Sequence, residues 1–163
     1  MMRLCDCDSA YDYESQCFLL DITLSKISGL IAQLLWLEAG ADLNCSTQEG
    51  ENALILAAKG KHVDCVKYLT EYMPSSALNH KDDVCGKTAL MWAASSPEKE
   101  SPLCMQHLTA AGAKVEEGDK DGYTALMLAV QNRHTDAVSL LLNNGALISI
   151  MTSDGETPLS TAL

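Results

Sequence analysis

The residues best suited to chemistry are two thiols near the N-terminus. Cys5 and Cys7 alternate with Asp6 and Asp8, so this segment offers sulfur and oxygen ligands of the kinds that bind metal ions. A structural zinc site needs a second ligand pair at a finger-like spacing, and no such pair follows in the sequence. The pattern therefore favours an acidic, flexible terminus over residues 1–12, without a metal.

Two histidines recur at equivalent places in the chain. His62 and His134 each separate one apolar segment from the next. This recurrence indicates that both histidines serve a turn between helices through hydrogen bonds, and it argues against catalysis or metal coordination. Cys65 stands at a position that is apolar in the pattern, which favours a small buried side chain. A Cys–His nucleophile pair is left open, because catalytic partners meet in space, but no signature supports one.

The composition narrows the classes of partner. The formal net charge of −11 repels nucleic acid and anionic membranes, whereas a protein surface remains possible. No phosphate-binding Gly-x-x-x-x-Gly-Lys-Ser/Thr motif is present, so we predict neither an enzyme nor a cofactor or small-molecule substrate. The seven scattered cysteines show no disulfide-like framework, and we expect neither a secretory signal nor a membrane-spanning segment. These features predict a cytoplasmic monomer, with a nuclear location left open.

The chain repeats itself with a period typical of repeat architectures. An apolar block headed by Asn or Thr begins at residues 52, 88, 124 and 157, so that the spacings are 36, 36 and 33 residues. A glycine stands two positions before each block, where a tight turn can use positive φ without steric cost. These glycines, which we interpret as turn tips, are Gly50, Gly86, Gly122 and Gly155.

Each unit is predicted to contain two short helices. The Asn or Thr at the head of the block can accept a backbone hydrogen bond and so cap the first helix. A second block at helical spacing follows, with Val63, Val66 and Leu69 in one copy. Small residues set the distance between neighbouring first helices, so we expect the paired alanines and one leucine per unit to be buried: Ala57, Ala58, Ala93, Ala94, Leu54, Leu90 and Leu126.

The order of turn, Gly-x-Thr-Ala-Leu-Met-x-Ala-Ala, His, Val-x-Leu-Leu-Leu and Gly-Ala resembles the ankyrin repeat, with Thr-Ala-Leu-Met in place of the commoner Thr-Pro-Leu-His. This variant is similar to expanded ankyrin families of protozoan parasites. The resemblance covers about residues 27–163 and implies an all-α solenoid of stacked helix-turn-helix units with β-hairpin-like turn tips. We expect an ankyrin domain over 13–163, with units at about 13–46, 47–82, 83–118 and 119–151. The partial unit over 152–163 is either unfinished or cut from a longer protein.

The turn between the two helices departs from the pattern in two ways. The usual glycine before the histidine is Lys61 or Arg133, so we expect Gly60 and Asn132, one place earlier, to adopt the left-handed conformation instead. The third unit has three extra residues in this turn, over 95–102, and the turn is expected to bulge outward.

Two serines in the extra turn precede prolines. Ser96 and Ser101 could each carry a phosphate that changes docking. Ser-Pro pairs are common in ordinary loops, so we favour unmodified serines.

The ankyrin resemblance implies that the turn tips and the exposed edge of the first helices form a groove that binds a partner protein. Trp92 and Tyr123 are of most interest, because Trp and Tyr are over-represented among residues that dominate binding energy; alternatively, Trp92 packs between units. We predict a scaffold or adaptor, and the alternative is a regulatory or targeting module of a larger enzyme such as a kinase. The candidate partner-binding residues are Glu51, Lys87, Tyr123, Glu156, Leu56, Trp92, Leu128, Lys59, Ser95, Gln131 and Asn132.

Overall fold

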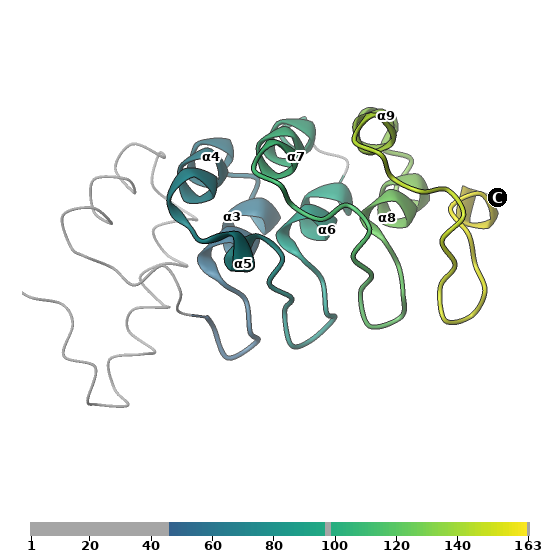
Figure 1. The fold of residues 1–163 in the computed structure, drawn as a ribbon, viewed down its shortest axis with the longest axis horizontal. Helices are drawn as coiled ribbons and strands as arrows, with labels where there is room; N and C mark the ends of the chain where they lie inside the picture. The colour runs from purple at the N-terminus through teal and green to yellow at the C-terminus, as the bar shows by residue number, and fades with distance from the viewer. Residues whose placement is uncertain (1–45, 97–98, 163) are drawn as a thin grey trace, which may run out of the picture.

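A computed structural model describes residues 46–96 and 99–162 of the chain (Figure 1). The predictions for the acidic terminus, for Cys5 and Cys7 and for nearly all of the first unit lie outside these residues.

The described residues form two rows of short helices. The first-helix row contains α3 (Ala53–Lys59), α6 (Ala89–Ala94) and α8 (Ala125–Gln131), and the second-helix row contains α4 (Val63–Tyr72), α7 (Ser101–Ala110) and α9 (Thr135–Asn143). Two shorter elements are α5 (Ser75–Leu78) and the 3₁₀ helix η1 (Ser160–Ala162). Both rows run along the long axis of the molecule, and loops project from one side of the stack (Figure 1). This arrangement confirms the predicted all-α stack of helix pairs.

Each first helix begins directly after a polar side chain that caps it. The side-chain oxygen of Asn52 accepts a hydrogen bond of 2.9 Å from the N–H of Ile55. Thr88 and Thr124 accept the equivalent bonds at 3.4 and 3.5 Å. The predicted caps are therefore present, and each satisfies a backbone N–H that has no partner inside the helix.

Small residues allow the stacked helices to pack closely. Each first helix packs against the next first helix, and each second helix packs against the next second helix. The paired alanines of α3 and α6 are fully buried, and the leucines Leu54, Leu90 and Leu126 are at most 2% exposed. Both predictions are confirmed. The stability of the stack therefore depends mainly on contacts between units.

The turn between paired helices differs from the prediction at one position. Lys61 and Arg133 have φ values of 56° and 54°, whereas φ is −81° at Gly60 and −86° at Asn132. The expectation that Gly60 and Asn132 adopt the left-handed conformation is wrong. The two N–H groups that follow Gly60 bond back to carbonyls of α3 in a Schellman motif. That geometry places the left-handed residue directly after the C-cap residue, whatever its type.

The third unit joins α6 to α7 through the longer turn that the sequence indicates. Helix α7 begins at Ser101, and Pro102 follows in the first turn, where its missing N–H costs nothing. Ser101 is fully buried, which supports the interpretation of this residue as an unmodified serine. Ser96 is partly exposed, and its state stays a prediction.

Candidate protein-binding surface

Four loops, which we call the fingers, project from the first-helix side of the stack (Figure 1). They span residues 47–51, 82–87, 119–123 and 152–156, and each closes with a backbone hydrogen bond between its two ends. In the third finger, the N–H of Asp119 donates to the carbonyl of Tyr123 at 3.0 Å. The glycine near each tip has φ between 73° and 88°, a conformation that side chains other than glycine rarely adopt. The fingers are thus the expected hairpin-like tips.

Backbone hydrogen bonds also join each finger to the next. The three bonds measure between 2.8 and 3.1 Å and run from the N–H of Asp83 to Glu49, of Lys120 to Cys85 and of Ser153 to Asp121. The Lys120 ammonium adds bonds to the carbonyls of Asp83 and Val84 in the preceding finger. The fingers therefore form one continuous surface with a fixed spacing.

A side-chain oxygen at the start of each finger holds one of the predicted groove residues in place. In every finger this oxygen accepts a hydrogen bond of 2.8 to 3.2 Å from the N–H of the residue after the turn glycine. Those donor residues are four predicted groove residues, Glu51, Lys87, Tyr123 and Glu156. Sequence reasoning missed the acceptors, although Thr or Asp shortly before a turn glycine is a recognisable signal. The acceptors are Thr47, Asp82, Asp119 and Thr152.

Asp82 links its finger to the first-helix row. Its carboxylate accepts backbone hydrogen bonds from the three N–H groups of Val84, Cys85 and Lys87, and it also accepts a bond of 3.0 Å from the indole Nε1 of Trp92. Burial alone would raise the pKa of Asp82, but these hydrogen bonds favour the charged form and hold its pKa below the ordinary value. A buried, ionised carboxylate therefore anchors the tryptophan.

Two lysines flank the Trp92 ring. The ammonium groups of Lys59 and Lys87 lie 4.7 and 5.0 Å from the ring centroid, within the range of cation–π attraction. Lys59 also donates a hydrogen bond of 2.7 Å to Glu51, which raises the pKa of the lysine. Trp92 packs against the core and is partly exposed, and its role in binding a partner stays a prediction. The Trp92 cluster is the name we give to five residues: Trp92, Lys59, Lys87, Glu51 and Asp82.

A second contact lies farther along the finger surface. The Tyr123 hydroxyl donates a hydrogen bond of 2.6 Å to Oε2 of Glu156 in the next finger. This bond to a carboxylate raises the pKa of Tyr123, because loss of the phenol proton would leave two negative charges in contact. Two predicted groove residues are thus paired with one another.

The remaining candidates lie along the same row but differ in exposure. Gln131 is exposed and Leu56 is partly exposed, whereas Leu128 is only 7% exposed. The hydroxyl of Ser95 and the amide of Asn132 each donate to a carbonyl of their own first helix, at 2.8 and 2.7 Å. The polar groups of Ser95 and Asn132 therefore already make hydrogen bonds within the fold.

Neither the two buried thiols nor the two histidines of the turns are arranged for catalysis. Burial raises the pKa of Cys104 to about 11 and also raises the pKa of Cys65, so both thiols stay protonated, unlike a catalytic thiolate. The predicted buried role of Cys65 is thus supported. Neither His62 nor His134 makes a side-chain capping bond; it is their backbone N–H groups that close the turns. The hydrogen bonds of the two histidines at these turns are therefore those of the backbone.

In the part of the chain that the structure describes, no group of three or more His, Cys, Asp or Glu side chains could hold a metal ion. None of the helices in residues 46–96 and 99–162 is long and apolar enough to span a membrane.

Comparisons with known proteins agree with this architecture. The family model for ankyrin repeats (3 copies) matches residues 24–116 and 97–163. Ankyrin repeat and SOCS box protein 6 of Homo sapiens is 33% identical over 111 residues, which cover 64% of this chain and 25% of that protein. The nuclear factor NF-kappa-B p105 subunit of Mus musculus is 36% identical over 125 residues, which cover 76% of this chain and 13% of that protein.

A further relative carries an enzyme name. Palmitoyltransferase AKR1 of Lachancea kluyveri is 30% identical over 121 residues, which cover 74% of this chain and 16% of that protein. The chain thus spans about a quarter or less of the length of these relatives. The matching family model, the stacked helix pairs and the repeated cap and turn residues together show that the chain belongs to the ankyrin-repeat family.

Proposed function

We propose that this protein is a scaffold or adaptor that holds a partner protein on its finger surface, with the Trp92 cluster at the centre of the contact. Ankyrin repeats generally mediate protein–protein interaction and are generally not enzymes. The observation that supports the proposal most strongly is the arrangement of Trp92, which is partly exposed yet fixed by the Asp82 carboxylate and flanked by two lysines.

A fixed aromatic side chain favours binding because it loses little conformational freedom when a partner arrives. The hydrogen bond to Asp82 and the two cation–π contacts hold the ring, while backbone bonds between fingers keep the surrounding surface in place. Trp is also the residue type that most often dominates binding energy at interfaces. A contact between Trp92 and a partner protein can therefore be both rigid and strong.

The charge of the fingers suggests the chemistry of the partner. Exposed carboxylates lie in successive fingers at Glu49, Asp83, Asp121 and Asp154. Acidic side chains in a row attract a partner that carries basic residues and speed its approach at low salt. They also disfavour the phosphate backbone of nucleic acid. The proposed partner is thus a protein segment with Lys or Arg beside an apolar anchor.

A capture experiment tests the finger surface. The tagged chain and its Trp92→Ala and Lys87→Glu variants are exposed to an extract of their own source, and the retained proteins are identified and quantified. Each variant should weaken retention of the specific partner at least tenfold, equal to about 1.4 kcal/mol. Circular dichroism must first show that each variant keeps its helical content.

The matched control is Leu103→Ala. Leu103 is 48% exposed on α7, in the row that lies away from the fingers (Figure 1). This variant should retain the partner as the unchanged chain does. Equal retention by the chain and by the folded Trp92 and Lys87 variants would reject the finger surface as the binding site.

The second candidate function is a targeting module within a larger enzyme. The relative named palmitoyltransferase is the observation that favours this class, and nothing in the comparisons supports the kinase that we named as its example. Both candidates require that the finger surface bind a protein. They differ in whether the protein purified from its source is catalytically active, which an assay for acyl transfer would show.

A further inference from the structure

The second finger, residues 82–87, is one residue longer than the other three described fingers. In those three, the N–H of the turn glycine donates to the carbonyl three residues earlier, as Gly122 does to Asp119 at 3.1 Å. In the second finger, the N–H of Gly86 donates to the carbonyl four residues earlier, that of Asp82, at 3.0 Å. The turn of the second finger therefore contains one extra residue.

The hydrogen bonds between fingers identify the extra residue as Val84. Each finger donates to the preceding one from the residue after its side-chain acceptor, and the carbonyl that accepts belongs to the residue before the preceding turn glycine. In the second finger, Asp83 is the donor and Cys85 is the acceptor, so Val84 between them has no counterpart in the other described fingers. Val84 is 60% exposed. The insertion thus adds an exposed aliphatic side chain to a row of polar turns.

Val84 is held in place from two sides. Its N–H donates a hydrogen bond of 3.0 Å to Oδ1 of Asp82, whose Oδ2 accepts the indole N–H of Trp92 at 3.0 Å. From the third finger, the Lys120 ammonium bonds to the carbonyls of Asp83 and Val84. Valine is branched at Cβ, so its side chain has few rotamers. Val84 therefore loses little conformational freedom on binding, and one carboxylate fixes its position relative to Trp92.

The charges around Val84 indicate which partner chemistry fits there. Asp83 precedes Val84 in the chain, and Glu49 and Asp121 lie in the fingers on either side; all three residues are exposed. In the turns of these three fingers the single ammonium group is that of Lys120, which already bonds to backbone carbonyls. An apolar side chain flanked by Lys or Arg is complementary to this surface, whereas an acidic segment is repelled.

We propose that Val84 is a specificity-determining contact of the finger surface, which packs against an apolar side chain of the partner protein while Asp83 attracts a Lys or Arg beside that side chain. This inference rests on the proposed function, because Val84 belongs to the same surface. It adds an outer contact, in the turn of the second finger, to the inner contact at Trp92. The partner segment that binds best is the one that reaches both contacts.

Peptides selected on the chain test the outer contact. Short random peptides displayed on phage are selected on the immobilised chain, and the selected peptides are synthesised for measurement of their Kd by fluorescence anisotropy. They should contain an apolar residue beside Lys or Arg. Val84→Thr keeps the branched shape but replaces a methyl group by a hydroxyl, and it should weaken binding about fivefold. Val84→Ile should retain the affinity.

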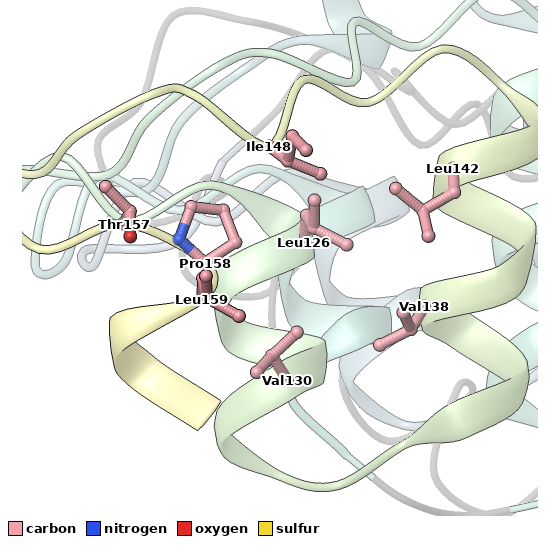
Figure 2. A pocket seen from close by; sticks show the side chains of 8 residues that line it. All are labelled: Leu126, Val130, Val138, Leu142, Ile148, Thr157, Pro158 and Leu159. Carbon is pink, nitrogen blue, oxygen red and sulfur yellow. The ribbon is translucent and has the colours of Figure 1, made fainter. Parts of the chain in front are cut away.

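Ile148→Thr is the matched control. Ile148 is also branched at Cβ and is 67% exposed, but it lines a pocket beside α8 and α9, outside the fingers (Figure 2). This variant should bind the peptides as the unchanged chain does. Asp83→Asn should weaken binding more at low salt than at high salt, because salt screens the attraction of Asp83 for Lys or Arg. Circular dichroism must first show that each variant keeps its helical content.

The outcomes separate this inference from the proposed function. Binding that Trp92→Ala weakens but that Val84→Thr and Asp83→Asn leave unchanged would overturn the role of Val84 and would leave the proposed function standing. Binding that none of the three variants weakens would overturn both. Selected peptides that are rich in Asp or Glu would overturn the partner chemistry that we infer from the charges around Val84.

Discussion

The indole Nε1 of Trp92 donates a hydrogen bond of 3.0 Å to Oδ2 of Asp82, ten residues earlier in the chain. The same carboxylate accepts three backbone N–H groups of its own finger. One buried charge thus couples the shape of a finger to the orientation of the aromatic side chain that we place at the centre of the binding surface.

Replacement of Asp82 by alanine should lower the free energy of unfolding by about 1–3 kcal/mol, because it leaves backbone donors and the indole N–H without their acceptor. Urea unfolding followed by circular dichroism measures the loss. Asp83→Ala, which removes the exposed neighbouring carboxylate, should change stability by no more than about 0.5 kcal/mol. Similar effects of the two substitutions would mean that the Asp82 bonds contribute no stability.

Protonation of the Asp82 carboxylate should lower the free energy of unfolding in acid. Its pKa is lowered in the folded protein, so the folded state favours the ionised form. The resulting stability is fully present above the unfolded pKa of about 3.9 and is lost as the pH falls through the lower folded pKa. We expect the difference in unfolding free energy between the chain and Asp82→Asn to be constant from pH 7 to 5 and to shrink below pH 4. A difference that stays constant down to pH 3 would contradict the assigned ionisation.

Replacement of Arg133 by glycine should stabilise the fold by about 0.5–1 kcal/mol. Arg133 has a φ of 54°, which costs a side-chain-bearing residue energy that glycine avoids. Thermal unfolding should show a raised Tm. Asn132→Gly is the matched control at the adjacent residue, where φ is −86° and glycine brings no such gain. A higher Tm for the control than for Arg133→Gly would show that strain at Arg133 is negligible.

The buried thiols should be unreactive in the native state. Burial raises the pKa of Cys104 to about 11, so the reactive thiolate is scarce at pH 8 and the probe has no access. Among the three cysteines of the described residues, Cys85 is partly exposed and should react with iodoacetamide before Cys65 and Cys104. Peptide mass spectrometry after timed alkylation gives the order. Fast modification of Cys104 in the folded chain would contradict the described core, whereas modification that requires urea would agree with it.

Much of the fold could be predicted because its determinants are local. The recurring Thr or Asn, the paired alanines and the turn glycines identify caps, close packing and turns within a few residues of one another. Leu90 illustrates this: its place in the repeat was enough to predict a position that is 1% exposed. The left-handed residue was assigned wrongly because the sequence shows residue types, whereas the bonding pattern at the helix end determines which position adopts positive φ.

The amino-acid sequence by itself determined the period, the helix pairs and the residues that follow each turn glycine in the fingers, because each follows from side-chain types at short, regular spacings. Only the tertiary structure decided how those residues engage one another. The Asp82–Trp92 bond, the Tyr123–Glu156 bond and the bonds of Lys120 to the second finger depend on distances between segments that only the stacked fold brings together. The spacing of residues along the sequence does not specify those distances, because they arise only when each unit packs on the next.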